Sequence, residues 1–267
     1  MLLMVNHRIF IALFCLTNLI VSNFVAAQQN LFVAVGWDKP PYVMNNARTG
    51  FEIELIRDVI KSIGYDAQFI QIPYGRSYDT LNMPNIDAVA TLSSKRQAKQ
   101  MTLSKAYIQY QNVVVTLAAS QIELTDVQDM SNLSIVGFQS AFRLLGNGFL
   151  KMASANPNYR EVPDQARQLK LLFSKKAQAI VLDVNIFNHL NRTLLGKVDE
   201  QPVVIHQLFS PSLYRVGFIE PKIQEQFDKA LVVYFSSERY AHLIQKYQFY
   251  NAAVSTGYPS IGSSKEE

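Results

Sequence analysis

Residues 31–72 read LFVAVGWDKPPYVMNNARTGFEIELIRDVIKSIGYDAQFIQI and decide the fold class. The stretch begins with the apolar run Leu31 to Gly36 and ends with the β-rich run Asp66 to Ile72. Between them, apolar residues recur at helical spacing from Ile53 to Ile63, with acidic residues in the first turn and Gly64 just past the end. A strand, a helix and a second strand in this order predict a parallel α/β unit.

The same alternation continues along the chain. Ile86 to Ala90 predicts a third strand, and Gln111 to Ala118 predicts a long fourth one. A second set of similar size follows and ends near Tyr250, after which residues 251–267 have the composition of a flexible tail. Its predicted strands are Leu133–Gly137, Gln178–Leu182, Val203–Phe209 and Tyr214–Ile219, and its predicted helices are Ser140–Ala153 with Ser140 as N-cap, Gln165–Phe173, Val184–Leu190, Pro221–Phe235 and Glu238–Phe249.

Residues 1–27 have the pattern of a secretory signal peptide. They carry one arginine and no acidic residue, then the apolar run Ile9 to Val21, then the small-residue end Val25-Ala26-Ala27. The alternative is an uncleaved anchor, but the run is shorter than the ~20 apolar residues that span a bilayer. We therefore expect cleavage after Ala27 and a periplasmic location. Cleavage would also remove Cys15, the only cysteine, and with it any disulfide or thiolate chemistry.

Composition excludes several classes of protein. With 49% hydrophobic and 17% charged residues among 267, the chain has enough apolar material for one large or two modest domains. The 25 basic and 21 acidic residues are spread along the chain, so we expect no nucleic-acid partner. The histidines lack metal-ligand spacing, and no Gly-x-Ser-x-Gly or phosphate-binding loop occurs. We therefore expect no metal, no cofactor and no catalytic residue.

Six segments, in their order and spacing, resemble the bacterial extracellular solute-binding proteins of family 3, the type that binds polar amino acids. They are WDKPPY (37–42), TGFEIELIRDVIKSIGY (49–65), PYGRSYDTLNMPNIDAVATLSSKRQAKQMTLSKAY (73–107), IVGFQSA (135–141), AIVLD (179–183) and YRVGF (214–218). The resemblance implies a two-lobed α/β fold of the type II periplasmic-binding-protein kind, with a ligand cleft between lobes joined by two hinge strands. It assigns residues 28–118 and 212–250 to lobe 1, and residues 119–211 to lobe 2.

The resemblance also assigns roles to two charged residues. An α-amino acid carries a carboxylate and an ammonium, so a cleft that excludes water must offer each a partner. Arg96 aligns with the family's carboxylate-binding arginine, with Ser93 and Ser94 as further donors. Asp183 aligns with the acid that accepts the ligand's ammonium. The alternatives are a solvated helix start for Arg96 and an N-cap of the next helix for Asp183.

The loop after the first strand supplies an aromatic candidate. Trp37, the only tryptophan, stands beside Asp38 and Tyr42, where its ring would form a wall against a ligand side chain or cation. The alternative is that the Trp37 ring fills the core beside the hinge. A loop position offers few ways to bury so large a ring, so we favour the pocket role for these three residues.

Two further positions complete the predicted site. Residues 137–141 join a strand to a helix, and Ser140 would present free N–H groups there to the ligand's carboxylate; a plain capped helix is the alternative. Tyr74 and Arg76 follow Pro73 in a loop, where they line the cleft mouth or cap the next helix.

Together these patterns favour a periplasmic binding protein. It would act as a monomer, close over a small polar ligand, an amino acid or a related carboxylate, and pass it to a membrane permease or a sensor. One alternative is an exported dehydratase, because such enzymes resemble this family; it would need a general acid or base such as Asp38 or Asp183. A third is a protein with a degenerate cleft that acts through protein contacts, since Pro84 and Lys95 depart from the family pattern.

Overall fold

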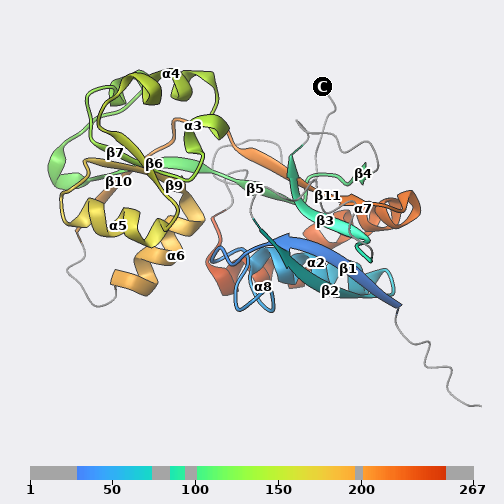
Figure 1. The fold of residues 1–267 in the computed structure, drawn as a ribbon. Helices are drawn as coiled ribbons and strands as arrows, with labels where there is room; N and C mark the ends of the chain where they lie inside the picture. The colour runs from blue at the N-terminus through green and yellow to red at the C-terminus, as the bar shows by residue number, and fades with distance from the viewer. Residues whose placement is uncertain (1–28, 74–84, 94–100, 196–200, 251–267) are drawn as a thin grey trace, which may run out of the picture.

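The computed structural model describes residues 29–73, 85–93, 101–195 and 201–250. Within these ranges the chain forms two lobes, each a mixed β-sheet with helices packed against it (Figure 1). The first lobe contains β1 (Gln29–Gly36), α2 (Phe51–Ser62), β2 (Tyr65–Ile72), β3 (Ala88–Ser93), β4 (Thr102–Leu103), β5 (Ile108–Tyr110), β11 (Ser212–Phe218), α7 (Pro221–Phe235) and α8 (Glu238–Tyr247). The second contains β6 (Asn112–Leu117), η2 (Ala118–Ser120), η3 (Val127–Met130), β7 (Ile135–Phe138), α3 (Ala141–Leu144), α4 (Asn147–Ala155), β8 (Tyr159–Val162), α5 (Gln165–Phe173), β9 (Ala179–Asp183), α6 (Val184–Leu195) and β10 (Val203–His206).

The first sheet has the strand order β2-β1-β3-β11-β4, and β5 also pairs with β11. β1 runs parallel to β2 and β3, as the alternation in residues 31–72 predicts, and β11 returns antiparallel to β3. The helix α2 begins after Gly50, whose φ is 123° and where a Cβ atom would lie 2.2 Å from the carbonyl oxygen of Tyr42. Only glycine fits that approach, so the loop and the start of α2 are fixed together.

The second sheet has the order β10-β6-β9-β7-β8. β7 is parallel to β8 and β9, whereas β6 is antiparallel to β9 and β10. The resemblance places the lobe boundary after residue 118. In the structure the chain changes sheet earlier, after Tyr110, because β6 belongs wholly to the second sheet. The predicted single strand Gln111–Ala118 is thus preceded by a separate strand, β5, in the other lobe.

Other differences have local causes. The predicted helix Ser140–Ala153 is broken into α3 and α4 at Gly146, whose φ of 91° interrupts the helical path. The predicted strand Val203–Phe209 ends at His206, because the residues after it cross between the lobes. The helix at Val184 continues to Leu195, and α7 has the predicted bounds. The predictions for residues 1–27 and 251–267 lie outside the described residues.

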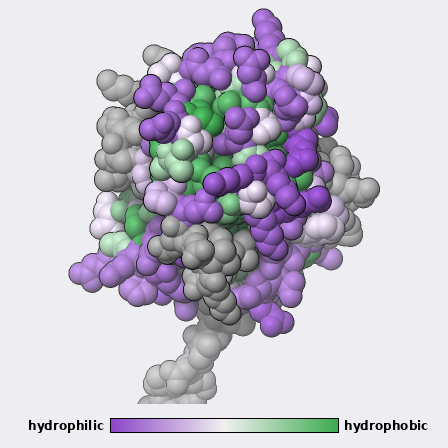
Figure 2. Space-filling view, turned by 90° about the vertical axis from the view of Figure 1, so that its left-hand side faces the viewer, coloured by the Kyte–Doolittle hydropathy of each residue, from purple (hydrophilic) through white to green (hydrophobic). Residues whose placement is uncertain are grey.

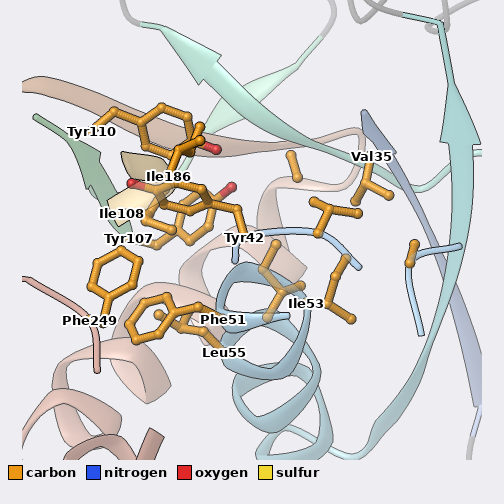
Figure 3. Close-up of a cluster of buried hydrophobic side chains, with 14 of the residues drawn as sticks. Val35, Tyr42, Phe51, Ile53, Leu55, Tyr107, Ile108, Tyr110, Ile186 and Phe249 are labelled. Atoms are coloured by element: carbon orange, nitrogen blue, oxygen red, sulfur yellow. The ribbon is translucent and has the colours of Figure 1, made fainter. Parts of the chain in front are cut away.

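An aromatic cluster forms part of the buried core (Figure 3). Phe51 from α2 stacks on Phe249 near the C-terminus at 3.7 Å between ring centroids. Tyr42 packs at 4.1 Å on Tyr110 of β5 and edge-on at 5.3 Å to Phe249. Offset and edge contacts of this kind add to the area that the rings bury. The cluster therefore joins the loop after β1, the helix α2 and the end of the described chain.

The outer surface of the second lobe is mostly polar. Figure 2 views the molecule from that end, and hydrophilic side chains cover most of the face, with a smaller apolar area between them in its upper half. None of the helices in the described ranges is both long enough and apolar enough to cross a membrane.

Candidate functional site

The lobes meet at two adjacent chain crossings. Gln111 forms the first, between β5 and β6, and residues 207–211 form the second, between β10 and β11. The Nε2 atom of Gln111 donates to the carbonyl oxygen of Phe209 at 2.8 Å, which ties the crossings side by side. The C-terminal end adds a third link, since the side-chain amide of Asn185 pairs with the backbone N–H and C=O of Tyr250 at 2.6 and 3.1 Å. Adjacent crossings of this kind form a hinge.

Asp183, the last residue of β9, lies directly at this hinge. Its Oδ1 accepts hydrogen bonds from the Tyr42 hydroxyl at 2.8 Å and from the backbone N–H groups of Asn185 and Ile186 at 2.9 and 3.1 Å. Its Oδ2 accepts from the backbone N–H of Gln111 at 2.9 Å. The N-cap interpretation of Asp183 is therefore confirmed, whereas its contact with a ligand stays a prediction.

The Asp183 carboxyl group is almost fully withdrawn from solvent. The residue is 2% exposed, and burial raises its pKa to about 6, while the hydrogen bond from Tyr42 and those from the start of α6 act in the opposite direction. The Tyr42 hydroxyl comes from the first lobe, so this bond joins the two lobes. The sequence favours a pocket role for Tyr42, and the structure buries this residue completely, with its hydroxyl donating to Asp183.

Lys39 belongs to the segment WDKPPY, whose sequence assigns it no role, and its ammonium lies over aromatic rings at the same junction. Its Nζ is 4.2 Å from the ring centroid of Tyr110 and 5.6 Å from that of Tyr42. Burial lowers the pKa of this ammonium, and the carboxylates of Glu52 and Asp183 oppose that effect. A tight turn fixes the residue, because its backbone N–H donates to the carbonyl of Val43 at 2.8 Å.

Glu52 is a second charged residue to which the sequence assigns no role in the site. The sequence places it in the first turn of α2, where an acid favours the helix dipole, yet it is 1% exposed. Its carboxylate accepts from the hydroxyls of Thr91 at 2.5 Å, of Tyr110 at 3.1 Å and of Tyr107. Burial, reinforced by this negative charge, holds the pKa of both tyrosines well above the usual value.

This buried group shapes the end of β3. Thr91 has a φ of 58°, a conformation that β-branched residues rarely adopt, and the register with β11 shifts here in a bulge. The Tyr107 hydroxyl accepts from the Thr91 backbone N–H at 3.0 Å, while the Thr91 hydroxyl is held by Glu52. The bulge directs the strand toward Ser93, the last residue of β3. Strained residues of this kind gather at functional sites.

The helix start after β7 differs from its predicted form. Ser140 stands at the predicted N-cap position of α3, but its φ is 67° and its side chain makes no cap bond. The backbone N–H groups of Ser140 and Phe142 donate to the two carboxylate oxygens of Glu161 at 2.7 and 2.9 Å. Tyr159 also donates to this carboxylate, at 2.8 Å. The chain's own acid therefore occupies the N–H groups that the sequence interpretation reserved for a ligand.

Replacing Glu161 by glutamine should lower the free energy of unfolding by about 1–3 kcal/mol, because one of the two N–H groups loses its acceptor. Urea denaturation followed by far-ultraviolet circular dichroism measures the change. Glu225→Gln, at an exposed position of α7, is the matched control and should change stability by less than about 0.5 kcal/mol. Equal midpoints for the two variants would show that Glu161 does not stabilise α3.

Of the remaining predicted site residues, some lie in the described ranges and others do not. Trp37 is 62% exposed, so the interpretation of its ring as hinge-side core is wrong. The Asp38 carboxylate accepts from the backbone of Asn46 at 3.0 Å and from the Gln71 side chain at 2.8 Å, and so holds the loop that carries Trp37. The predicted residues Tyr74, Arg76, Ser94 and Arg96 lie outside the described residues. In the part of the chain that the structure describes, no group of three or more acidic, histidine or cysteine side chains is arranged to hold a metal ion.

Comparison with known proteins gives a consistent result. The sequence pattern of the bacterial extracellular solute-binding proteins, family 3, matches residues 31–250. No curated protein matches the chain. The ligand-binding core of GluR0 in complex with L-glutamate has a TM-score of 0.66 and 15% identity, over 83% of this chain and 99% of that one.

Two further solved structures share the fold. A mutant of ArgBP from T. maritima has a TM-score of 0.60 and 19% identity, over 84% of this chain and 97% of that one. The ancestral amino-acid-binding protein AncCDT-1, a precursor of cyclohexadienyl dehydratase, has a TM-score of 0.61 and 18% identity, over 84% and 97%. These similarities confirm the two-lobed, type II α/β fold that the sequence motifs imply.

Proposed function

Because the chain belongs to the bacterial extracellular solute-binding proteins of family 3, we propose that it closes its lobes over a small polar ligand that carries a carboxylate, an amino acid or a related acid. The observation that carries the proposal is the hinge. Two chain crossings, bound to each other through Gln111 and Phe209, join the two sheets. Trp37 follows the end of β1 in a loop, and Asp183 ends β9 directly before α6. Ligands of open α/β sheets bind at such carboxyl ends of strands.

In this proposal residues 112–206 form the moving lobe and residues 29–110 with 212–250 the other. Arg96 follows the strained bulge at Thr91 and binds the ligand's carboxylate through its planar fork, with Ser93 and Ser94 as neighbours. Trp37 offers an exposed aromatic face to the rest of the ligand. Residues 1–27 act as a signal peptide cleaved after Ala27, and the exported protein serves a permease or a sensor as a monomer.

Binding without chemistry is favoured by the state of the two acids that an enzyme would use. Both oxygens of Asp183 accept hydrogen bonds from the chain itself. The Asp38 carboxylate holds the loop through Asn46 and Gln71. A general acid or base needs an oxygen within reach of the substrate, so neither group is free for that role in this conformation. Turnover of a prephenate-like acid by the purified protein would overturn this part of the proposal.

The test is thermal unfolding of the full chain, purified after export, against amino acids, polyamines, dicarboxylates and keto acids. A ligand at 100 times its Kd adds about 2.7 kcal/mol of stability, and each kcal/mol raises Tm by roughly 2–4 °C in a protein of this size. A rise of several degrees with one compound supports the proposal and identifies the ligand. A panel without any shift would contradict it.

Arg96→Ala should weaken binding of the compound found in that panel by about 30-fold or more, because loss of a charged partner costs at least about 2 kcal/mol. Isothermal titration calorimetry measures the change. Arg239→Ala is the matched control: it removes the same charge from α8, where Arg239 pairs with Asp58 at 3.5 Å, and should leave affinity unchanged. Unchanged affinity in the Arg96 variant would contradict the assignment of the carboxylate site.

A further inference from the structure

We propose that the second lobe binds the anionic surface of a phospholipid membrane through four basic residues at the end of α5. This α5 basic face consists of Arg167, Lys170, Lys175 and Lys176. The surface is separate from the ligand site, and the inference takes from the proposed function only the export of the protein into a compartment bounded by a membrane. Three observations carry it: the outward orientation of the face, the absence of described acidic partners, and the backbone conformation of Lys175.

The helix α5 presents this face to solvent because its other face is fixed on the second sheet. The side-chain amide of Gln168 donates to the carbonyl oxygens of Val136 in β7 and Val181 in β9, at 2.8 and 3.0 Å. Leu169 and Leu172 are buried beside it. Figure 1 shows α5 next to α6 on one side of that sheet. All four basic residues are exposed, and at the rise of a helix they begin within about 15 Å of one another.

No acid in the described part of the chain neutralises this face. Basic and acidic residues are nearly balanced over the whole sequence, but residues 130–195 hold eight of lysine and arginine and only three acids. Each of these acids serves a helix start: Glu161 binds the N–H groups of α3, Asp164 those of α5, and Asp183 those of α6. Among the described residues, the side chains of the α5 basic face form no hydrogen bond and no ion pair. Their charge is therefore left for an anionic partner.

Lys175 occupies a backbone position that favours glycine. It follows Ser174, the C-cap of α5, and its φ is 59°. Its N–H donates to the carbonyl of Leu172, and the N–H of Lys176 donates to that of Leu171, both at 2.9 Å. This is the helix ending in which the left-handed residue is usually glycine, because a Cβ atom is unfavourable there. The chain thus keeps a cation where folding alone favours glycine, and such strain is typical of functional positions.

A lipid surface fits this face better than a protein surface does. Stable protein interfaces bury aromatic or aliphatic anchors at their centre. In the described ranges the exposed large apolar side chains nearest in sequence are Leu144 and Val204, both outside α5. A face that offers charge without an apolar anchor matches the phosphates of lipid headgroups. Near an anionic membrane each lysine or arginine strengthens binding about fivefold.

The first experiment measures co-sedimentation of the full chain, purified after export, with two kinds of vesicle. One kind is phosphatidylcholine alone, and the other contains an equal part of phosphatidylglycerol. We expect binding to the anionic vesicles only. Raising NaCl from about 0.1 M to about 1 M should release the protein, because the Debye length falls from about 10 Å to about 3 Å. Equal binding to both kinds of vesicle, or no binding to the anionic kind, would overturn the inference. Neither result bears on solute binding, which the thermal unfolding panel tests separately.

Two double variants then separate the α5 basic face from the positive charge of the whole protein. Lys170→Gln/Lys176→Gln should weaken binding to the anionic vesicles about 25-fold. The matched control, Lys61→Gln/Lys229→Gln, removes the same charge from exposed positions of α2 and α7 and should weaken binding less than about threefold. Equal losses in the two variants would overturn the assignment of the face.

Lys175→Gly tests the strained lysine with two readouts that move in opposite directions. The variant should bind anionic vesicles about fivefold more weakly, yet its urea denaturation midpoint should rise, because glycine adopts a positive φ without strain. Lys175→Gln is the control: it loses the charge but keeps the Cβ atom, so it should lose the same affinity without the gain in stability. Unchanged vesicle binding in both variants would overturn the role of Lys175.

Discussion

Glu52→Ala should lower the free energy of unfolding by about 3–5 kcal/mol, the range found when one partner of a buried charged network is removed. The carboxylate is buried, and its removal leaves the hydroxyls of Thr91, Tyr107 and Tyr110 without their acceptor. It also removes one of the two negative charges near Lys39. Urea denaturation followed by circular dichroism measures the loss.

The matched control is Glu54→Ala, on the same helical turn. Glu54 accepts from Lys246 at 2.7 Å and from the Tyr247 hydroxyl at 2.6 Å, but its side chain reaches solvent. An exposed ion pair contributes at most about 1 kcal/mol, so this variant should be destabilised far less. If the two variants lost the same stability, the network around Glu52 would have no special role in holding the bulge at Thr91.

The protein should also lose stability through Asp183 as pH rises from about 4 to about 6. Burial raises the pKa of this group from 3.8 to about 6, so the folded state binds its proton more tightly than the unfolded state. Between those values the unfolded state carries fewer protons, and stability therefore falls with rising pH. This shift in the pKa of Asp183 corresponds to a change of roughly 3 kcal/mol in the free energy of unfolding.

Other acids titrate in the same interval, so the measurement is a difference between variants. The free energy of unfolding of the unchanged protein minus that of Asp183→Asn should fall by roughly 2 kcal/mol between pH 4 and pH 7, because part of the effect lies below pH 4. Asp129→Asn is the control of opposite sign, because backbone N–H bonds from Thr125 and Asp126 lower the pKa of Asp129. A difference for Asp183→Asn that stays constant with pH would contradict the raised pKa.

Much of the fold could be predicted from the spacing of apolar residues. α2 and α7 have strong helical stripes with clear ends, and Pro221 begins α7 where a proline is tolerated. The pairing partners of the strands could not be predicted in the same way. The run after Gln111 has the composition of a buried strand, but nothing local states which sheet it joins, and the structure places it in the second. Local propensity also missed the break at Gly146, because the apolar pattern continues across it.

The candidate site was harder to predict because its contacts are long-range. The resemblance to a family identified Asp183, whereas the donors that occupy it come from Tyr42 and Gln111, distant in sequence. A usable signal did exist for Glu52. It lies one helical turn before Leu55 and Ile56, on the apolar face of α2, where an acid must find partners. Lys39 offered no comparable signal, since lysines in loops are usually solvated.

The position of β11 has a consequence for the order in which the lobes can form. This strand pairs with β3, β4 and β5 in the first sheet, and α7 and α8, which pack on α2, follow it in the chain. The second sheet, by contrast, comes from the single stretch 112–206. Because the chain is synthesised from its N-terminus, all strands of the second lobe are present before β11 is made. At that stage the first lobe still lacks β11 and the helices α7 and α8 that pack on α2. The lobe that begins the sequence is therefore the last that can be completed. The second crossing of the hinge, between β10 and β11, also forms only at that stage.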